Sequence, residues 1–189
     1  MGSLNTSELK KGVKLLFDNQ PYVTLAVDFV KPGKGNAFYK IRVQNLITNN
    51  VLEKTIRSGE SMESADVIDT DMEFLYRQAG EFVFMDSTSF EQVTVSANCV
   101  GDQHDLLMDN MSCVVTLWDG QPIAVRLPAS MSVVVDYTEP AVKGDTQSRV
   151  MKEAVLTTGA KVQVPTFVSI GDKITINTES RQYTGRDNK

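Results

Sequence analysis

The sequence predicts an all-β protein made of small barrels. Short runs that alternate apolar and polar residues recur along nearly the whole chain, with turn-forming residues between them roughly every 8 to 12 residues. Only residues 98–110 look helical, and weakly. Composition separates three segments of about 60 residues each, too small for immunoglobulin-type sandwiches and suited to five-stranded barrels of SH3-like or OB type.

Each expected strand is short. In chain order, the strand-like runs are VKLLF (13–17), YVTLAVDFV (22–30), FYKIRVQNL (38–46), VLEKTI (51–56), VVTLWDGQPIAVRL (114–127), MSVVVDYT (131–138), KVQVP (161–165) and KITINT (173–178). The strongest hairpin signal is Asp119-Gly120, because this pair suits a two-residue turn between alternating runs.

Charge changes at the same places as composition and gives the predicted domains 1–64, 65–128 and 129–189. Their formal charges are +3, −9 and +1, within a total of −5. No acidic residue occurs in 29–52. This asymmetry predicts that the first domain meets a polyanion and that the acidic second domain faces away from it. The acidic run 63–73 lacks the spacing of a calcium loop and is expected to be a solvated linker.

Several function classes are not expected. No apolar run has the length of a membrane helix, and the first residues lack the apolar stretch of a signal peptide, so we expect a cytoplasmic protein without membrane contact. Cys99, Cys113 and His104 are too few for a structural zinc site, and we expect two free thiols and a surface imidazole. No nucleophile motif or carboxylate pair stands out, so we expect no catalytic residue, no metal and no enzyme activity.

The motif KPGKG (31–35) is the most informative short segment. Pro32-Gly33 favours a type II turn, in which Gly33 takes the positive φ. Between two strands this turn forms a hairpin tip, and Lys34 then lies between two glycines with no neighbouring side chain to pair it. Two interpretations remain open: a solvated lysine in a tight turn, or a flexible amine presented to a partner or a modifying enzyme.

Longer segments resemble a known family. FVKPGKGNAFYKIRVQNL resembles the lysine-tip hairpin of elongation factor P, and VLEKTIRSGESMESADV, EFVFMDSTSFEQ and VTLWDGQPIAV resemble its following segments. The family's third-domain signature is K-x-A-x4-G-x2-V-x-V-P-x2-V-x2-G. It is met by Lys152, Ala154, Gly159, Val162, Val164, Pro165, Val168 and Gly171. The resemblance covers the whole chain.

The resemblance implies an SH3-like (KOW-like) barrel followed by two OB barrels, arranged in an L that mimics tRNA. It implies a monomer that contacts both ribosomal subunits and peptidyl-tRNA, between the peptidyl-tRNA and exit sites, and relieves stalling at consecutive prolines. Lys34 matches the lysine that a separate enzyme modifies covalently, and no other cofactor is implied. Its tip loop would comprise Lys31, Pro32, Gly33, Gly35 and Asn36. Candidate contacts to tRNA or ribosomal RNA are Lys40, Arg42, Gly144, Asp145, Thr146, Arg149, Lys152, Tyr183 and Arg186.

One segment departs from the family pattern. After Gly144-Asp145-Thr146, the family has a glycine-rich loop that ends in Lys-Pro-Ala, whereas this chain continues QSRVMKEA (147–154). Arg149 could replace the lost contacts with a phosphate contact, or the chain could be a specialised paralogue. A generic OB-fold RNA-binding or RNA-chaperone protein is the alternative from another class. Such a protein usually stacks bases on several aromatic side chains of one surface, and this chain has few of them, since aromatic residues make up 7% of it.

Overall fold

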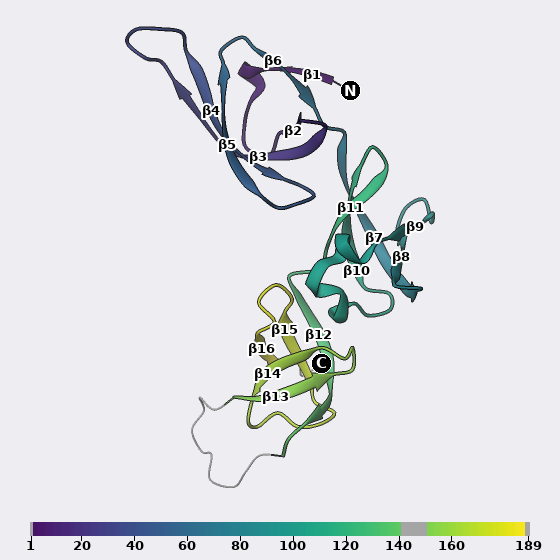
Figure 1. Cartoon of the computed structure of the whole chain (residues 1–189). Coiled ribbons are helices and arrows are strands. Elements are labelled where there is room, and N and C mark those ends of the chain that lie inside the picture. Colours follow the sequence, from purple (N-terminus) through teal and green to yellow (C-terminus); the bar gives the residue numbers. More distant parts are fainter. Residues whose placement is uncertain (1, 141–150, 188–189) are drawn as a thin grey trace. The chain divides into compact units, whose positions relative to one another are not determined.

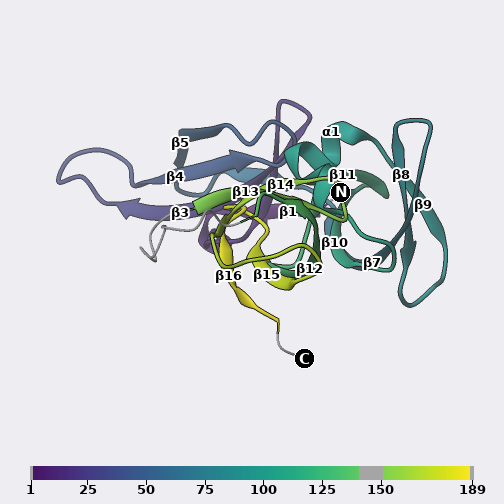
Figure 2. The same cartoon turned by 90° about the horizontal axis from the view of Figure 1, so that it is seen from below.

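The structure is a computed structural model that describes residues 2–140 and 151–187, and it confirms the all-β prediction (Figures 1 and 2). The strands are β1 (Gly2–Asn5), β2 (Lys14–Phe17), β3 (Gln20–Val30), β4 (Phe38–Asn45), β5 (Val51–Arg57), β6 (Ser61–Ser64), β7 (Val67–Gln78), β8 (Glu81–Asp86), β9 (Gln92–Val95), β10 (Ser112–Trp118), β11 (Gln121–Arg126), β12 (Ser130–Thr138), β13 (Met151–Leu156), β14 (Lys161–Pro165), β15 (Lys173–Asn177) and β16 (Tyr183–Arg186). The short helical elements are η1 (Thr6–Glu8), α1 (Ala97–Val100) and η2 (Gly101–Leu106). The last two confirm the weak helical signal at 98–110.

The strands form three sheets in chain order. The first sheet has the order β1-β6-β2-β3-β4-β5, the second β11-β10-β7-β8-β9, and the third β14-β13-β12-β15-β16. By contacts, residues 1–70 and 115–124 form one compact unit, and residues 71–114 and 125–189 form another. The predicted domain ranges and their L-shaped arrangement stay predictions.

The first sheet encloses an apolar core on one face. The buried side chains of this core are Leu15, Tyr22, Ile41, Val43, Ile56 and Met62. Alternate side chains of β4 point to opposite faces, so Ile41 and Val43 are buried while Lys40 and Arg42 are exposed. This alternation, which a strand requires, sets the basic side chains of β4 on the outer face.

The acidic run 63–73 is not the solvated linker that the sequence suggested. β6 extends to Ser64 and β7 begins at Val67, so only two residues lie between the strands. Val67, Met72 and Phe74 are buried. The burial of these three apolar residues stabilises the strand. The acidic residues around them led to the linker prediction because they obscure the apolar positions in the sequence.

The predicted hairpin at Asp119-Gly120 is confirmed. It joins β10 to β11, and the φ angles of Asp119 and Gly120 are 47° and 77°. Both residues are therefore in the left-handed region, which a two-residue turn of this kind requires.

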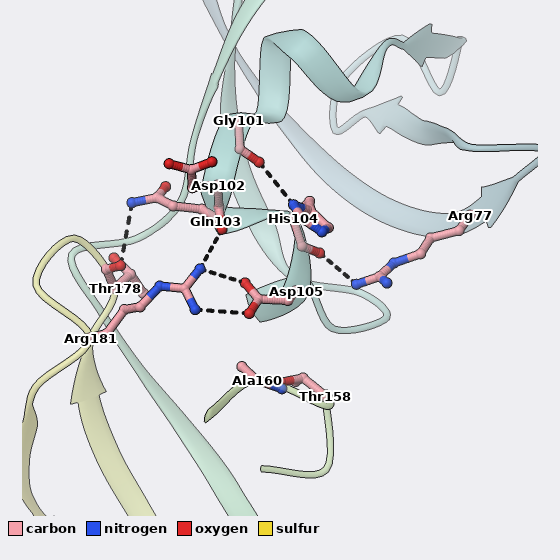
Figure 3. Close-up of polar contacts among 10 residues, drawn as sticks. All are labelled: Arg77, Gly101, Asp102, Gln103, His104, Asp105, Thr158, Ala160, Thr178 and Arg181. Carbon is pink, nitrogen blue, oxygen red and sulfur yellow. Dashed lines mark hydrogen bonds and ion pairs between the residues drawn. The ribbon is translucent and has the colours of Figure 1, made fainter. Parts of the chain in front are cut away.

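Polar contacts join the third sheet to the helical segment of the second (Figure 3). The Arg181 guanidinium donates to both carboxylate oxygens of Asp105, at 2.8 and 2.7 Å, and also to the backbone carbonyl of Asp102. The Gln103 amide donates to the Thr178 carbonyl at 3.3 Å. These residues lie in the same compact unit, and their contacts hold η2 against the loop between β15 and β16.

Candidate functional site at the tip of the β3–β4 hairpin

The loop between β3 and β4 extends beyond the rest of the first sheet (Figures 1 and 2). β3 and β4 pair in antiparallel register up to Val30 and Phe38, and residues 31–37 close the hairpin. All side chains from Lys31 to Asn36 are exposed. The hairpin tip that the sequence predicted is thus present.

The predicted type II turn at Pro32-Gly33 is wrong. The positive φ in this loop belongs to Gly35, at 107°, and not to Gly33. A type II turn suits a tight connection, whereas the strands here separate after Val30 and leave a longer loop. Gly35, the residue after Lys34, is therefore the glycine of this loop whose conformation other residues rarely adopt.

The two lysines of the tip differ in their surroundings. The Lys31 ammonium lies 5.4 Å from the centre of the Phe29 ring, a cation–π contact. The Phe29 ring packs in turn on Tyr39, with ring centres 4.7 Å apart. Lys34 has no hydrogen bond, ion pair or ring contact with any residue in the described part of the chain. Lys31 is thus held at the base of the tip, and Lys34 is the free amine.

Neighbouring strands reduce the positive charge that the sequence suggested for β4. In the strand register, Lys40 stands opposite Asp28 of β3, and Arg42 stands opposite Glu53 of β5. Residues 29–52 contain no acid, but both flanking acids lie opposite the basic side chains once the strands pair. Neither acid forms an ion pair with the cation opposite it, so Lys40 and Arg42 stay without a partner among the described residues, while the tip has no acid opposite it at all.

The described candidate RNA contacts of the third sheet already interact with other residues of the chain. The Arg186 guanidinium donates to the Phe167 carbonyl at 2.8 Å and to Asp172 at 3.2 Å, and it stacks on the Phe167 ring. Tyr183 meets the same ring edge-on, with centres 6.4 Å apart. The Lys152 ammonium donates to the Glu139 carbonyl at 2.6 Å. The other four candidates of this region, Gly144, Asp145, Thr146 and Arg149, lie outside the described residues.

Free basic side chains are unevenly distributed. Each described Lys or Arg of the third sheet has an acceptor, and the remaining pairs are Lys161 with Glu153 at 3.0 Å and Lys173 with Asp187 at 3.0 Å. In the first sheet and its loops, several cations have no such partner among the residues described: Lys10, Lys11, Lys34, Lys40, Arg42 and Arg57. The first sheet is the better surface for a polyanion.

Sequence reasoning missed Arg181 and Phe90. Arg181 was passed over in favour of its neighbours Tyr183 and Arg186, yet it makes the fork contact with Asp105. Phe90 lies in the loop between β8 and β9, and it is 69% exposed. Each stands four positions after an Asp or Asn that begins its loop, Asp86 or Asn177, and this spacing marks the two positions but not the contact that Arg181 makes.

Neither Cys99 nor Cys113 forms a disulfide, as predicted. Cys113 is buried in β10, and desolvation raises the pKa of its thiol to about 11, so it stays protonated and unreactive near neutral pH. Across residues 2–140 and 151–187, no three metal-binding side chains cluster together. The same residues include no helix of sufficient length and apolar character to cross a bilayer.

Comparison with known proteins agrees with this architecture. Three family models match consecutive parts of the chain: the elongation factor P KOW-like domain at 5–62, its OB domain at 67–125, and its C-terminal domain at 131–186. Two solved structures share the fold. Translation initiation factor 5A from Methanococcus jannaschii has a TM-score of 0.56 at 17% identity, covering 67% of this chain and 94% of its own. The translation initiation factor 5A family protein from Naegleria fowleri has a TM-score of 0.54 at 15% identity. The match covers 67% of this chain and 98% of that protein.

A KOW-like domain, an OB domain and a C-terminal domain, all three of elongation factor P, follow one another in this chain, which gives it the domains of a translation factor. Elongation factor P of Pectobacterium atrosepticum is 41% identical over 186 residues, which covers 98% of this chain and 99% of that protein. The chain therefore belongs to the elongation factor P family, and it is a translation elongation factor.

Proposed function

We propose that this elongation factor binds the ribosome between the peptidyl-tRNA and exit sites and stimulates peptide bond formation at consecutive prolines through the Lys34 amine. The observation that carries the proposal is the position of Lys34, exposed and unpartnered at the end of a projecting hairpin. The protein acts without catalytic residues of its own, since the ribosome performs the reaction.

The hairpin suits a long, narrow approach to a reaction centre. β3 is paired with β4 along its length, β4 is paired with β5, and the Ser58 amide donates to the Ala37 carbonyl at 3.0 Å beside the tip. The cation–π contact of Lys31 with Phe29 restrains the start of the loop. A restrained base with one free amine at its end delivers that amine to a defined point, while the side chain itself stays flexible.

Proline is a poor substrate for peptide bond formation because its ring restricts the backbone. The reacting atoms must be held in a near-attack geometry, and an added contact to the end of peptidyl-tRNA lowers the entropic cost of that alignment. A cationic amine at Lys34, lengthened by a covalent group from a separate enzyme, provides such a contact. The Lys34 side chain is exposed, so an enzyme can reach its Nζ.

The distribution of free cations supports RNA contact by the first domain. Its unpaired Lys and Arg would lie along tRNA or ribosomal RNA, where phosphate contacts position a protein without reading sequence. The third domain contributes through Lys152, Tyr183 and the segment with Gly144, Asp145, Thr146 and Arg149. The −9 charge of the second domain directs that domain toward protein or solvent. A cytoplasmic monomer, free of metal and of noncovalent cofactor, completes the proposal.

The proposal is tested by the mass of the protein purified from its native host, with peptide mapping. We expect a mass increment confined to the tip peptide and located on Lys34, and none on Lys31. A homogeneous unmodified protein that still relieves proline stalling would contradict the proposed modification. An increment on a lysine of another domain would contradict the assignment of the site.

A further inference from the structure

The same four-residue loop occurs three times in the structure, once in each sheet. It joins β4 to β5 after Asn45, β8 to β9 after Asp86, and β15 to β16 after Asn177. In each, the amide of the first residue donates to the carbonyl five residues later, at 2.9, 2.9 and 2.8 Å. In each, the side-chain oxygen of the first residue accepts a hydrogen bond from a loop amide at 2.8 or 2.9 Å.

The last residue of each loop is in the left-handed region. The φ angles are 60° for Asn49, 62° for Phe90 and 56° for Arg181. Asn is favoured there because its short polar side chain tolerates this conformation, and five of the eight described non-glycine residues with positive φ are Asn or Asp. A bulky aromatic residue is an outlier. Phe90 and Arg181 therefore occupy positions at which the backbone alone would select another residue.

For Arg181, the reason is visible. Its side chain reaches Asp105 and makes the fork contact shown in Figure 3. A strained position is thus filled by the residue that makes a specific contact. Such outliers gather at functional positions, where the surrounding structure holds the strain.

For Phe90, no ring contact or side-chain hydrogen bond among the described residues accounts for the choice of side chain. Its ring makes no aromatic or cation–π contact with a described residue. Its 69% exposure is the highest among the exposed large apolar residues. Arg181 occupies the equivalent position because its side chain binds Asp105. By analogy, we expect the Phe90 side chain to have its partner outside the chain.

The surroundings of Phe90 indicate the chemistry of that partner. Asp86 and Glu91 flank the loop, and the Ser87 amide donates to the Asp71 carbonyl, which brings a third carboxylate residue near. No Lys or Arg occurs between Arg77 and Arg126 in the chain, but Arg126 lines a pocket together with Asp71, so the acidic rim of Phe90 is made by Asp86 and Glu91. Carboxylates repel a phosphate backbone, so a ring that stacks on RNA bases is disfavoured here. An apolar anchor within an acidic rim fits an apolar pocket bordered by Lys and Arg.

We infer that Phe90 is the anchor of a protein-docking surface, made of Phe90 with Asp86 and Glu91, whose partner is a basic ribosomal protein with an apolar pocket. This inference rests on the proposed function, because it places that partner on the ribosome. The surface belongs to the loop between β8 and β9 of the second sheet, whereas Lys34 belongs to a loop of the first sheet.

The first test is the affinity of labelled full-length protein for purified ribosomes. Phe90→Asn installs the residue that the equivalent position of the first sheet already uses, so this variant should fold at least as stably as the wild type. We expect it to bind about ten-fold more weakly, whereas Phe90→Trp retains wild-type affinity. Ile170→Asn is the matched control, since Ile170 is an exposed apolar loop residue at 58% and should change affinity little.

The second test is photo-crosslinking from Phe90→p-benzoylphenylalanine on the same ribosomes. We expect the adduct on a ribosomal protein, at a site bordered by Lys or Arg. Adducts on ribosomal RNA, or a Phe90→Asn variant that binds as tightly as the wild type, would overturn this inference alone. Wild-type protein that does not bind ribosomes would overturn the proposed function and this inference with it.

Discussion

Arg181, in the loop between β15 and β16, holds Asp105 of η2 in a two-point contact, with both carboxylate oxygens within 2.8 Å of guanidinium nitrogens. The second and third sheets share no strand, so strand pairing does not fix one against the other. A planar guanidinium that meets a carboxylate at two points restricts orientation as well as distance. This contact therefore orients the third sheet against the helical segment of the second.

A double-mutant cycle on Arg181 and Asp105 should show coupling. We expect a coupling free energy of about 1 kcal/mol or more in urea unfolding, because the pair is bidentate and partly buried. Arg181→Lys should not restore it, since an ammonium lacks the fork geometry. The control pair is Lys161 with Glu153, whose side chains are 67% and 54% exposed, and it should couple weakly. Additive effects of Arg181→Ala and Asp105→Ala would contradict the orienting role.

Gly33 and Gly35 should respond differently to alanine. Gly35→Ala places a Cβ at a φ of 107°, which costs about 1 kcal/mol and should alter the tip conformation. Gly33→Ala meets no atom within 4 Å and no positive φ, so it should leave the amide chemical shifts of the tip nearly unchanged. Larger changes from Gly33→Ala than from Gly35→Ala would show that the turn is the one the sequence suggested.

The loop of Phe90 should weaken in acid. Hydrogen bonds from the Ser89 and Thr88 amides hold the pKa of Asp86 below its usual value. A group with a depressed folded-state pKa stabilises the fold above its unfolded pKa, and this stabilisation is lost as pH falls through the folded value. Asp86→Asn keeps the acceptor oxygen, as Asn45 does in the first sheet, and should reduce the loss of stability below about pH 4. If Asp86→Asn loses as much stability below about pH 4 as the wild type does, the role of this carboxylate is contradicted.

Removal of one positive charge should matter more in the first domain than in the third. Lys40→Ala should weaken ribosome binding and reduce the slope of log affinity against log salt by about one, as expected for a lost phosphate contact. Lys161→Ala removes the same charge from a residue already paired with Glu153 and should change the slope little. Equal effects of the two variants would show that ion pairing in the free protein does not decide which lysines meet RNA.

Local signals in the sequence predicted most of the fold. Asp119-Gly120 predicted its hairpin correctly because a two-residue turn depends on the two residues themselves. Pro32-Gly33 misled because the loop is longer than a tight turn, and its length depends on where β3 and β4 stop pairing. The acid-free stretch 29–52 does not reveal that Asp28 and Glu53 stand opposite Lys40 and Arg42, because that depends on the register of neighbouring strands.

The candidate site was predictable at Lys34 and less so elsewhere. Lys34 lies between glycines within one short motif, so its exposure follows from local sequence. The engagement of Lys31 with Phe29 depends on side-chain packing across the hairpin. The contact of Arg181 joins residues far apart in the chain, and no sequence pattern in a single chain indicates it.

The most direct measurement of whether the Lys34 amine is the working group is relief of stalling at a proline run in a reconstituted translation reaction. Lys34→Ala, Lys34→Arg and Lys31→Ala should unfold at the same midpoint as the wild type, because exposed loop side chains contribute little stability. We expect both Lys34 variants to lose relief, including Lys34→Arg, which keeps the charge without an amine that can be extended, while Lys31→Ala retains most of it. Full relief by Lys34→Ala would contradict the account.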